Sequence, residues 1–215
     1  MRDCFIFDLD GTLLNTLHDL TDSTNAVMRA CGYPECSEEQ ILSYVGDGAR
    51  RLIFLAVPEG TPEEDAEAAL ELWKKRYPEQ GYPRTTPYKG IPETLQELRA
   101  AGAKLGVLSN KFDGAAKGNI EQFLPGRFDA VYGERVGIPR KPDPTSLLMT
   151  IEELGSEPAR TVYVGDSPVD MQTARNAGAF ALGVAWGFNP PESLVQAGAD
   201  AVAETPACIL DYLLA

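Results

Sequence analysis

Short apolar runs alternate with helical patterns along this chain, and no other feature constrains its fold as strongly. The runs predict five strands and a shorter edge strand, at residues 4–7, 104–108, 129–132, 161–164, 180–184 and 201–203. Helical patterns lie between them, for example at 92–101, 146–154 and 170–177. The alternation predicts an α/β fold whose core is a Rossmann-like, doubly wound parallel sheet.

One gap in this pattern is too long for a simple connection. Residues 8–103 separate the first strand from the second, whereas a crossover needs only about a dozen residues. The segment 17–83 is purely helical in pattern. It predicts a helix at 17–30, a second that is opened by the capping box Ser37-Glu38-Glu39-Gln40, and a third that runs towards Tyr77. The third is opened by Thr61-Pro62-Glu63-Glu64, in which Thr61 is expected to act as the capping residue. We therefore expect a core domain of residues 1–15 and 84–215, with a small helical cap domain of residues 16–83 inserted after the first strand.

The charge of the chain narrows the choice of partner. The 215 residues include 19 Lys and Arg against 32 Asp and Glu, so the formal net charge is −13. Binding to nucleic acid or to an anionic membrane depends on an excess of cations, and both are therefore disfavoured. The sequence has no signal peptide pattern and no apolar run near the ~18 residues of a membrane span. We expect a cytoplasmic protein, a monomer or homodimer, whose partner is a small molecule.

Polar motifs follow the predicted strands, where open α/β sheets bind their ligands. One more motif precedes the helix at 146–154. The motifs are Asp8-Leu9-Asp10-Gly11-Thr12, Ser109-Asn110-Lys111, Arg140-Lys141-Pro142-Asp143-Pro144 and Gly165-Asp166-Ser167-Pro168-Val169-Asp170. The carboxyl ends of parallel strands share one edge of the sheet. We expect four carboxylates, a hydroxyl and a lysine to converge there.

Carboxylates that share a site raise one another's pKa values unless a cation compensates them. Mg²⁺ with oxygen ligands is the usual cation where a phosphate also takes part. Four carboxylates, one Mg²⁺ and Lys141 leave one negative charge, which protonation of one Asp would remove. Asp8 and Asp10 are two residues apart, so one can attack a phosphoryl group while the other handles protons.

These motifs together resemble those of the haloacid dehalogenase superfamily of phosphatases. The residues that carry the resemblance are Asp8-Leu9-Asp10-Gly11-Thr12-Leu13-Leu14, Ser109, Lys141 and Gly165-Asp166-Ser167-Pro168-Val169-Asp170, and they span essentially the whole chain. The resemblance implies that Asp8 is the nucleophile, which becomes an aspartyl phosphate, and that Asp10 is the general acid and base. Superfamily members with other chemistry lack the second Asp, so the presence of Asp10 favours phosphoryl transfer.

The resemblance also implies the rest of the site. Ser109 and Lys141 would hold the phosphoryl oxygens, and we group Asn110 and Thr12 with them as phosphate-binding candidates. Mg²⁺ would be bound by the Asp8 carboxylate and the Asp10 backbone carbonyl, and by two further carboxylates, Asp166 and, in support, Asp170.

Within the superfamily, three segments are similar to the phosphoglycolate phosphatase group: Gly46-Asp47-Gly48-Ala49-Arg50-Arg51, Pro87-Tyr88-Lys89-Gly90 and Ser109-Asn110-Lys111. The first would be a cap loop that closes over the substrate, with Arg50 or Arg51 pairing with a substrate carboxylate. On a helical cap, such a basic pair is also consistent with a solvated face. Asn15 departs from the family, which often has Asp at that position.

The leading hypothesis is thus a Mg²⁺-dependent phosphatase that hydrolyses a small phosphate monoester through an aspartyl phosphate, with 2-phosphoglycolate as the candidate substrate. The alternatives are a sugar-phosphate mutase or a pyrophosphatase on the same scaffold, and a non-catalytic sensor of a phosphorylated metabolite. The intact pair Asp8 and Asp10 argues against the sensor, because a protein that only binds has no need of a nucleophile.

Overall fold

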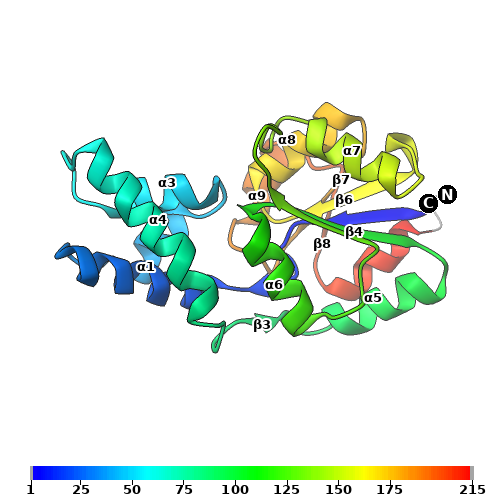
Figure 1. Ribbon diagram of the computed structural model, residues 1–215. Helices are drawn as coiled ribbons and strands as arrows, with labels where there is room; N and C mark the ends of the chain where they lie inside the picture. The colour runs from blue at the N-terminus through cyan, green and yellow to red at the C-terminus, as the bar shows by residue number, and fades with distance from the viewer. Residues whose placement is uncertain (1, 214–215) are drawn as a thin grey trace. The chain divides into compact units, whose positions relative to one another are not determined.

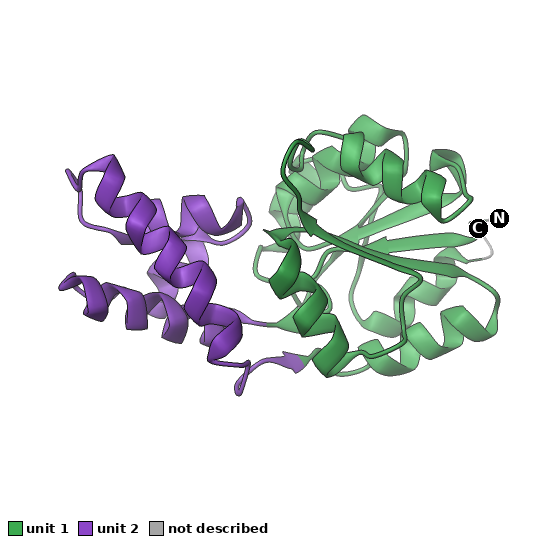
Figure 2. Ribbon diagram, viewed as in Figure 1, with its two compact units in different colours: residues 1–15, 87–215 green, residues 16–86 purple. Residues whose placement is uncertain are grey.

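The computed structural model, which describes residues 2–213, divides into two units (Figure 2). Unit 1 comprises Met1–Asn15 and Pro87–Ala215, and unit 2 comprises Thr16–Thr86. Unit 1 is an α/β structure and unit 2 is mainly helical. The chain leaves unit 1 shortly after its first strand and returns to it before the second strand of the large sheet.

Unit 1 is built on a six-stranded sheet in the order β5-β4-β1-β6-β7-β8 (Figure 1). All its strand pairs are parallel. The strands are β1 (Cys4–Phe7), β4 (Lys104–Phe112), β5 (Ala130–Glu134), β6 (Thr161–Gly165), β7 (Phe180–Val184) and β8 (Ala201–Ala203). A separate two-stranded sheet pairs β2 (Leu14–Asn15) with β3 (Thr86–Pro87). The predicted α/β fold with a parallel sheet is confirmed.

Helices cover both faces of the large sheet, and β1 contributes to the hydrophobic core on each side. Phe5 and Phe7 pack with residues of α5 (Ile91–Ala100), α6 (Asp113–Phe123) and the 3₁₀ helix η2 (Pro206–Tyr212). Cys4 and Ile6 pack with residues of α7 (Thr145–Glu153), α8 (Pro168–Ala177) and α9 (Pro191–Gln196). A short 3₁₀ helix, η1 (Pro158–Arg160), precedes β6. Because strand side chains alternate between faces, an unbroken apolar run such as 4–7 belongs to a strand that is covered on both sides.

Strand β4 is longer than predicted, and this corrects the placement of one motif. The sequence pattern ends the strand at Leu108, but β4 continues to Phe112 and includes Ser109, Asn110 and Lys111. These three polar residues are buried. The pairing with β5 shifts register between Leu108 and Phe112. Polar residues read as the end of a strand in the sequence, but here they are buried because other parts of the site supply their partners.

Unit 2 contains four helices: α1 (Leu17–Cys31), α2 (Glu38–Tyr44), α3 (Gly48–Ala56) and α4 (Glu63–Glu79). The capping box at Ser37 is confirmed, since its hydroxyl accepts from the Gln40 N–H and the Gln40 side chain accepts from the Ser37 N–H. The capping role of Thr61 is wrong: its hydroxyl donates to the Pro58 carbonyl, and α4 begins after Pro62 without a side-chain cap.

Helix α3 corrects a second expectation. Its first residues, from Gly48 through Arg51, were expected in a loop, but they form its first turn. Leu52 and Ile53 are buried in unit 2, so α3 is held by an apolar face that the short segment 46–51 does not reveal.

The return to unit 1 lies at residue 86/87, three residues beyond the position expected from the sequence. Buried Asp19 on α1 explains why residues 84 and 85 stay with unit 2. Its carboxylate accepts hydrogen bonds from the Arg84 N–H and, at 2.6 Å, from the Thr85 hydroxyl.

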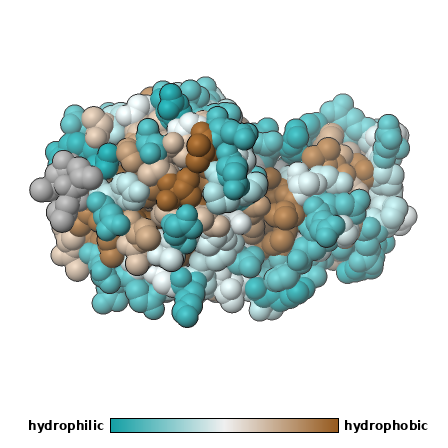
Figure 3. Space-filling view, turned by 180° about the vertical axis from the view of Figure 1, so that it is seen from behind, coloured by the Kyte–Doolittle hydropathy of each residue, from teal (hydrophilic) through white to brown (hydrophobic). Residues whose placement is uncertain are grey.

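Hydrophilic residues are spread over the face drawn in Figure 3, and hydrophobic residues reach the surface there in several patches. None of the helices in residues 2–213 combines the length and the apolar character needed to cross a membrane.

Candidate active site

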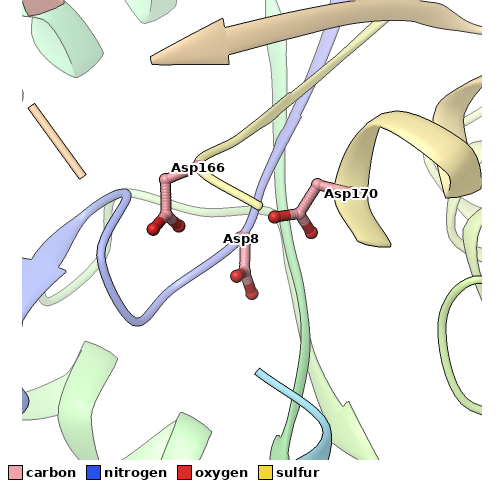
Figure 4. Close-up of side chains that lie close together, drawn as sticks. All are labelled: Asp8, Asp166 and Asp170. Carbon is pink, nitrogen blue, oxygen red and sulfur yellow. The ribbon is translucent and has the colours of Figure 1, made fainter. Parts of the chain in front are cut away.

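Three carboxylates meet at the carboxyl edge of the large sheet (Figure 4). Asp8 directly follows β1, Asp166 directly follows β6, and Asp170 lies in the first turn of α8. One oxygen from each lies within 4.8 Å of the others, and all three residues are buried. We call these three residues the acidic cluster. Strands β1 and β6 are neighbours in the sheet, which is why residues so distant in the sequence come together here.

Lys141 supplies the positive charge of the cluster. Its Nζ lies 2.6 Å from Asp170 Oδ1 and 3.0 Å from Asp8 Oδ1. Burial by itself lowers the pKa of Lys141, but Asp170 and Asp8 raise that pKa well above the usual range, so the ammonium stays charged. The contact with Asp8 is an ion pair without hydrogen-bond alignment, and Asp8 Oδ1 accepts no hydrogen bond from any group within residues 2–213.

Asp170 is held on both of its oxygens. Oδ2 accepts hydrogen bonds from the Ser167 hydroxyl at 2.6 Å and from the Ser167 N–H at 3.0 Å, in the capping box that opens α8. Oδ1 accepts from Lys141 and lies 3.3 Å from the Tyr163 hydroxyl. Asp170 therefore has two roles: it orients the ammonium of Lys141, and it adds a negative charge to the acidic cluster.

Asp166 is also held on both oxygens, by residues from two different loops. The Thr12 hydroxyl donates to Oδ1 at 2.8 Å, and the Phe188 N–H donates to Oδ2 at 2.8 Å. Thr12, a phosphate-binding candidate from the sequence, thus has its hydroxyl on a carboxylate. Trp186 donates in turn to the Thr12 carbonyl at 3.1 Å.

The segment 185–188, directly after β7, contributes to the site although it was not among the sequence candidates. A Cβ atom on Gly187 would lie 2.2 Å from the Cβ of Asp166, so only glycine allows this close approach. The other motifs were identified because ligands of an open α/β sheet bind beyond the carboxyl ends of its strands. The same rule applies to the carboxyl end of β7, and it was the signal that could have identified Gly187 and Phe188.

Asp10 is not a member of the acidic cluster, and its carboxylate forms an ion pair with Lys111. The Lys111 Nζ lies 2.8 Å from Oδ1 and 3.2 Å from Oδ2 of Asp10. Lys111 belongs to the motif Ser109-Asn110-Lys111, but it was not predicted from the sequence as a site residue. The signal was its position two residues after Ser109, which places both on the same face of a regular strand.

Asn110 and Ser109 support their neighbours. The Asn110 side chain accepts a hydrogen bond from the Lys141 N–H at 3.0 Å and donates to the Lys141 carbonyl at 3.3 Å. The Ser109 hydroxyl accepts from the Lys111 N–H at 3.3 Å. Arg50, the remaining candidate, belongs to unit 2, where its guanidinium pairs with Glu63 and Glu67 at 2.9 and 2.8 Å.

The electrostatics of the cluster fit a divalent cation. Burial raises the pKa of Asp8 to about 6, with Lys141 opposing this and Asp170 and Asp10 adding to it. Burial, with Asp170 and Asp8, raises the pKa of Asp166 to about 8. Both shifts reflect concentrated negative charge. An all-oxygen donor set that includes the unsatisfied Asp8 Oδ1 suits a hard cation such as Mg²⁺.

The charges balance without a protonated Asp once Lys111 is included. Three carboxylates and Lys141 leave two negative charges in the acidic cluster, which one divalent cation neutralises. Asp10 and Lys111 neutralise each other. The count from sequence left one negative charge because it omitted Lys111.

This fold and this site define a class of protein. A buried carboxylate next to a lysine, with two more carboxylates suited to a cation, at the carboxyl edge of a parallel sheet, is typical of a hydrolase that acts on an anionic group such as a phosphoryl group.

Comparisons with known proteins support assignment to a class of hydrolases. The family model for haloacid dehalogenase-like hydrolases matches residues 5–184, and the chain belongs to this family. The phosphoglycolate phosphatase of Vibrio cholerae is 34% identical over 216 residues, which cover 97% of this chain and 95% of that protein. The N-acetylmuramic acid 6-phosphate phosphatase of Pseudomonas aeruginosa is 30% identical, over 97% of this chain and 93% of that protein.

A crystal structure from Lactobacillus delbrueckii, provisionally described as a phosphoglycolate phosphatase, superposes with a TM-score of 0.90 at 30% identity, covering 99% of each chain. The family resemblance predicted from the motifs is thereby confirmed. The chain is a phosphoric monoester hydrolase of the haloacid dehalogenase type.

Proposed function

We propose that this protein is a Mg²⁺-dependent phosphatase that hydrolyses a small phosphate monoester through an aspartyl phosphate on Asp8. The observation that carries the proposal is the environment of Asp8: a buried carboxylate with one unsatisfied oxygen, 3.0 Å from a lysine and beside two further carboxylates. A buried carboxylate that is not held in a closed hydrogen-bond network is suited to act as a nucleophile, and this supports the proposed role of Asp8.

The reaction has two halves. In the first, Asp10 carries a proton that it takes up when the substrate binds. An Asp8 oxygen forms a bond to phosphorus, the ester P–O bond breaks, and the leaving oxygen takes the electron pair and that proton from Asp10. In the second, a water oxygen bonds to phosphorus, Asp10 takes the proton of that water, and the bond between Asp8 and phosphorus breaks to release inorganic phosphate. Asp10 returns to its starting state at the end of each cycle.

Lys141 and Ser109 are proposed to bind the phosphoryl oxygens. Lys141 is suited to this role because its ammonium lies beside Asp8, where a phosphoryl group would have to approach. Asn110 and Thr12 are proposed to act through the residues that they hold, Lys141 and Asp166 respectively.

Asp8, Asp166 and Asp170 would hold Mg²⁺, together with the Asp10 backbone carbonyl. When bound, the ion supplies positive charge that offsets the charge of the phosphoryl group and of the nucleophile. Removal of the ion leaves three buried carboxylates with a single lysine, so the unliganded site repels an anionic substrate.

The proposed substrate is 2-phosphoglycolate, on the basis of relatives such as the Vibrio cholerae enzyme. Arg50 is proposed to pair with the substrate carboxylate, in exchange for Glu63 or Glu67. An alternative substrate class is a sugar phosphate, because the Pseudomonas aeruginosa relative is named for N-acetylmuramic acid 6-phosphate. We further propose that the protein acts in the cytoplasm on a small phosphorylated substrate, and its acidic composition disfavours anionic membrane and nucleic acid as partners.

The test is release of inorganic phosphate from 2-phosphoglycolate, a hexose 6-phosphate and pyrophosphate, each with and without Mg²⁺. We expect turnover that requires Mg²⁺ and is abolished in Asp8→Asn. Activity retained by Asp8→Asn would refute the mechanism. Phosphorus NMR with the hexose phosphate separates hydrolysis from a mutase, since isomerisation without release of phosphate would overturn the hydrolase assignment. Fewer than one turnover per protein molecule with every substrate would favour a sensor.

A further inference from the structure

Lys111 is a buried cation without a role in the two half-reactions of the proposed mechanism. Its side chain is 3% exposed, and its Nζ lies within 3.2 Å of both oxygens of Asp10. An ammonium that contacts both oxygens of one carboxylate restricts the position of that carboxylate and also the rotation of its plane. The contact is made to the carboxylate that has to meet first the leaving oxygen and then the water.

The two buried lysines of the site contact different carboxylates. Lys141 contacts Asp8 and Asp170, within the acidic cluster. Lys111 contacts Asp10, which is not part of that cluster. Lys141 thus lies beside the acidic cluster, and Lys111 lies beside the carboxylate proposed to transfer protons.

The backbone of Lys111 is fixed by its surroundings. Strand β5 approaches it so closely that a Cβ atom on Gly133 would lie 2.3 Å from the Lys111 carbonyl oxygen. The N–H of Lys111 donates to the Ser109 hydroxyl. A side chain that starts from a fixed backbone and ends on a carboxylate is a rigid support for that carboxylate.

We propose that Lys111 is the positioning residue of Asp10, holding its carboxylate where both proton transfers take place. The inference rests on the proposed function. Lys111 takes no part in the bond changes: the proton moves from Asp10 to the leaving oxygen in the first half, and from water to Asp10 in the second. Lys111 acts by fixing the atoms between which that proton moves.

The experiment uses 2,4-dinitrophenyl phosphate, because dinitrophenolate leaves without needing a proton. The first half of the reaction then no longer needs the acid, whereas the second half still needs Asp10 to accept a proton from water. In Lys111→Met we expect a rapid burst of one dinitrophenolate per protein molecule, at close to the wild-type rate. A steady-state rate about 100-fold below that of the wild type should follow, the size typical of lost general acid–base catalysis.

Two variants serve as references. Asp10→Asn should give the same trace as Lys111→Met. Lys117→Met removes an exposed lysine on α6 that pairs with Asp113 at 2.6 Å, and it should match the wild type. If the first turnover of Lys111→Met slows as much as its steady state, or if neither slows, Lys111 does not act through Asp10 and the inference is overturned.

Should Lys111→Met fail to fold, the double variant Asp10→Asn/Lys111→Met decides, because it leaves neither charge of the pair behind. We expect its trace to match that of Asp10→Asn. A further loss in the first turnover would mean that Lys111 serves another group, and would also overturn the inference. A wild-type protein that releases no dinitrophenolate would instead refute the proposed function itself.

Discussion

The side-chain amide of Asn110 forms hydrogen bonds to the backbone of Lys141 through both its oxygen and its nitrogen. Its Oδ1 accepts from the Lys141 N–H at 3.0 Å, and its Nδ2 donates to the Lys141 carbonyl at 3.3 Å. Both residues are 5% exposed. The strand that carries Asn110 thereby fixes the point from which the Lys141 side chain reaches the acidic cluster.

Replacement of Asn110 by Ala should therefore affect both stability and activity. We expect the free energy of unfolding to fall by roughly 1–3 kcal/mol, because two buried backbone groups lose their partners. We expect kcat/KM to fall by about tenfold as Lys141 loses its placement. Denaturant unfolding and phosphate release measure these effects. Asn176→Ala, which removes a bond from an exposed Asn to the Pro142 carbonyl, is the control. Unchanged stability of Asn110→Ala would contradict the interpretation.

Thr12→Val distinguishes two roles for the Thr12 hydroxyl. If the hydroxyl orients Asp166, as its 2.8 Å hydrogen bond indicates, the variant should need about 10- to 100-fold more Mg²⁺ for half-maximal activity. The KM for substrate at saturating Mg²⁺ should change little. A variant with a raised substrate KM and an unaltered Mg²⁺ requirement would show that Thr12 binds phosphate instead.

Gly187→Ala should disturb the proposed metal site, because Gly187 lies against Asp166. The new Cβ would lie 2.2 Å from the Cβ of Asp166, so one of the two residues has to move. We expect a loss of about 1–3 kcal/mol in stability and a raised Mg²⁺ requirement. Gly106→Ala, whose Cβ would meet Leu154 at 3.1 Å away from the site, should lower stability without changing that requirement. Equal Mg²⁺ requirements in the two variants would count against the proposed role of Asp166.

Without metal, the protein should lose stability as pH rises from 5.5 to 8.5. The pKa values of Asp8 and Asp166 are raised in the folded protein, to about 6 and about 8. Over this range the folded state holds more protons than the unfolded chain, so the free energy of unfolding falls with pH, by an amount on the order of a few kcal/mol. Urea unfolding in EDTA measures the slope, which should be shallower in Asp8→Asn.

Mg²⁺ should oppose this loss most strongly at the upper end of the range, because it binds the ionised carboxylates of the folded state. A free energy of unfolding that rises with pH in EDTA across 5.5–8.5 would contradict the assignment of these two groups.

Arg50→Ala tests the role proposed for unit 2. If Arg50 binds the substrate carboxylate, the variant should raise the KM for 2-phosphoglycolate by about tenfold, while an alkyl phosphate without a carboxylate is little affected. Arg51→Ala, which removes the neighbouring cation paired with Asp47, is the comparison. Equal changes in KM for both substrates would leave Arg50 as a surface residue paired with Glu63 and Glu67.

Much of the fold could be predicted from local pattern. Strands β1, β7 and β8 begin and end where the apolar runs 4–7, 180–184 and 201–203 do. These runs are hydrophobic because their strands are buried, so pattern and structure have the same cause. The apolar pattern ends at Leu108, before the end of β4, because residues 109–111 are polar. Their burial depends on partners such as Asp10 and Lys141, which are distant in the sequence.

The same limit applies to the site. The acidic cluster could be predicted because all its members stand at strand ends or in the first turn of the next helix. The roles of Thr12 and Asn110 could not, because a hydroxyl or an amide has no sequence pattern that says which of several neighbours it will bond. The position of Lys111, two residues after Ser109, was a signal for the site, but its partner could not be predicted, because Asp10 is 101 positions away.

The order of strands in the large sheet has a consequence for biosynthesis. Strand β1 lies between β4 and β6, yet the ribosome makes it before the whole of unit 2 and before either neighbour. The strand that precedes Asp8 is therefore the first strand of this sheet to be made, and its pairing with β6 is incomplete until residue 164 has been added. The acidic cluster comes into existence only after most of the chain has been translated.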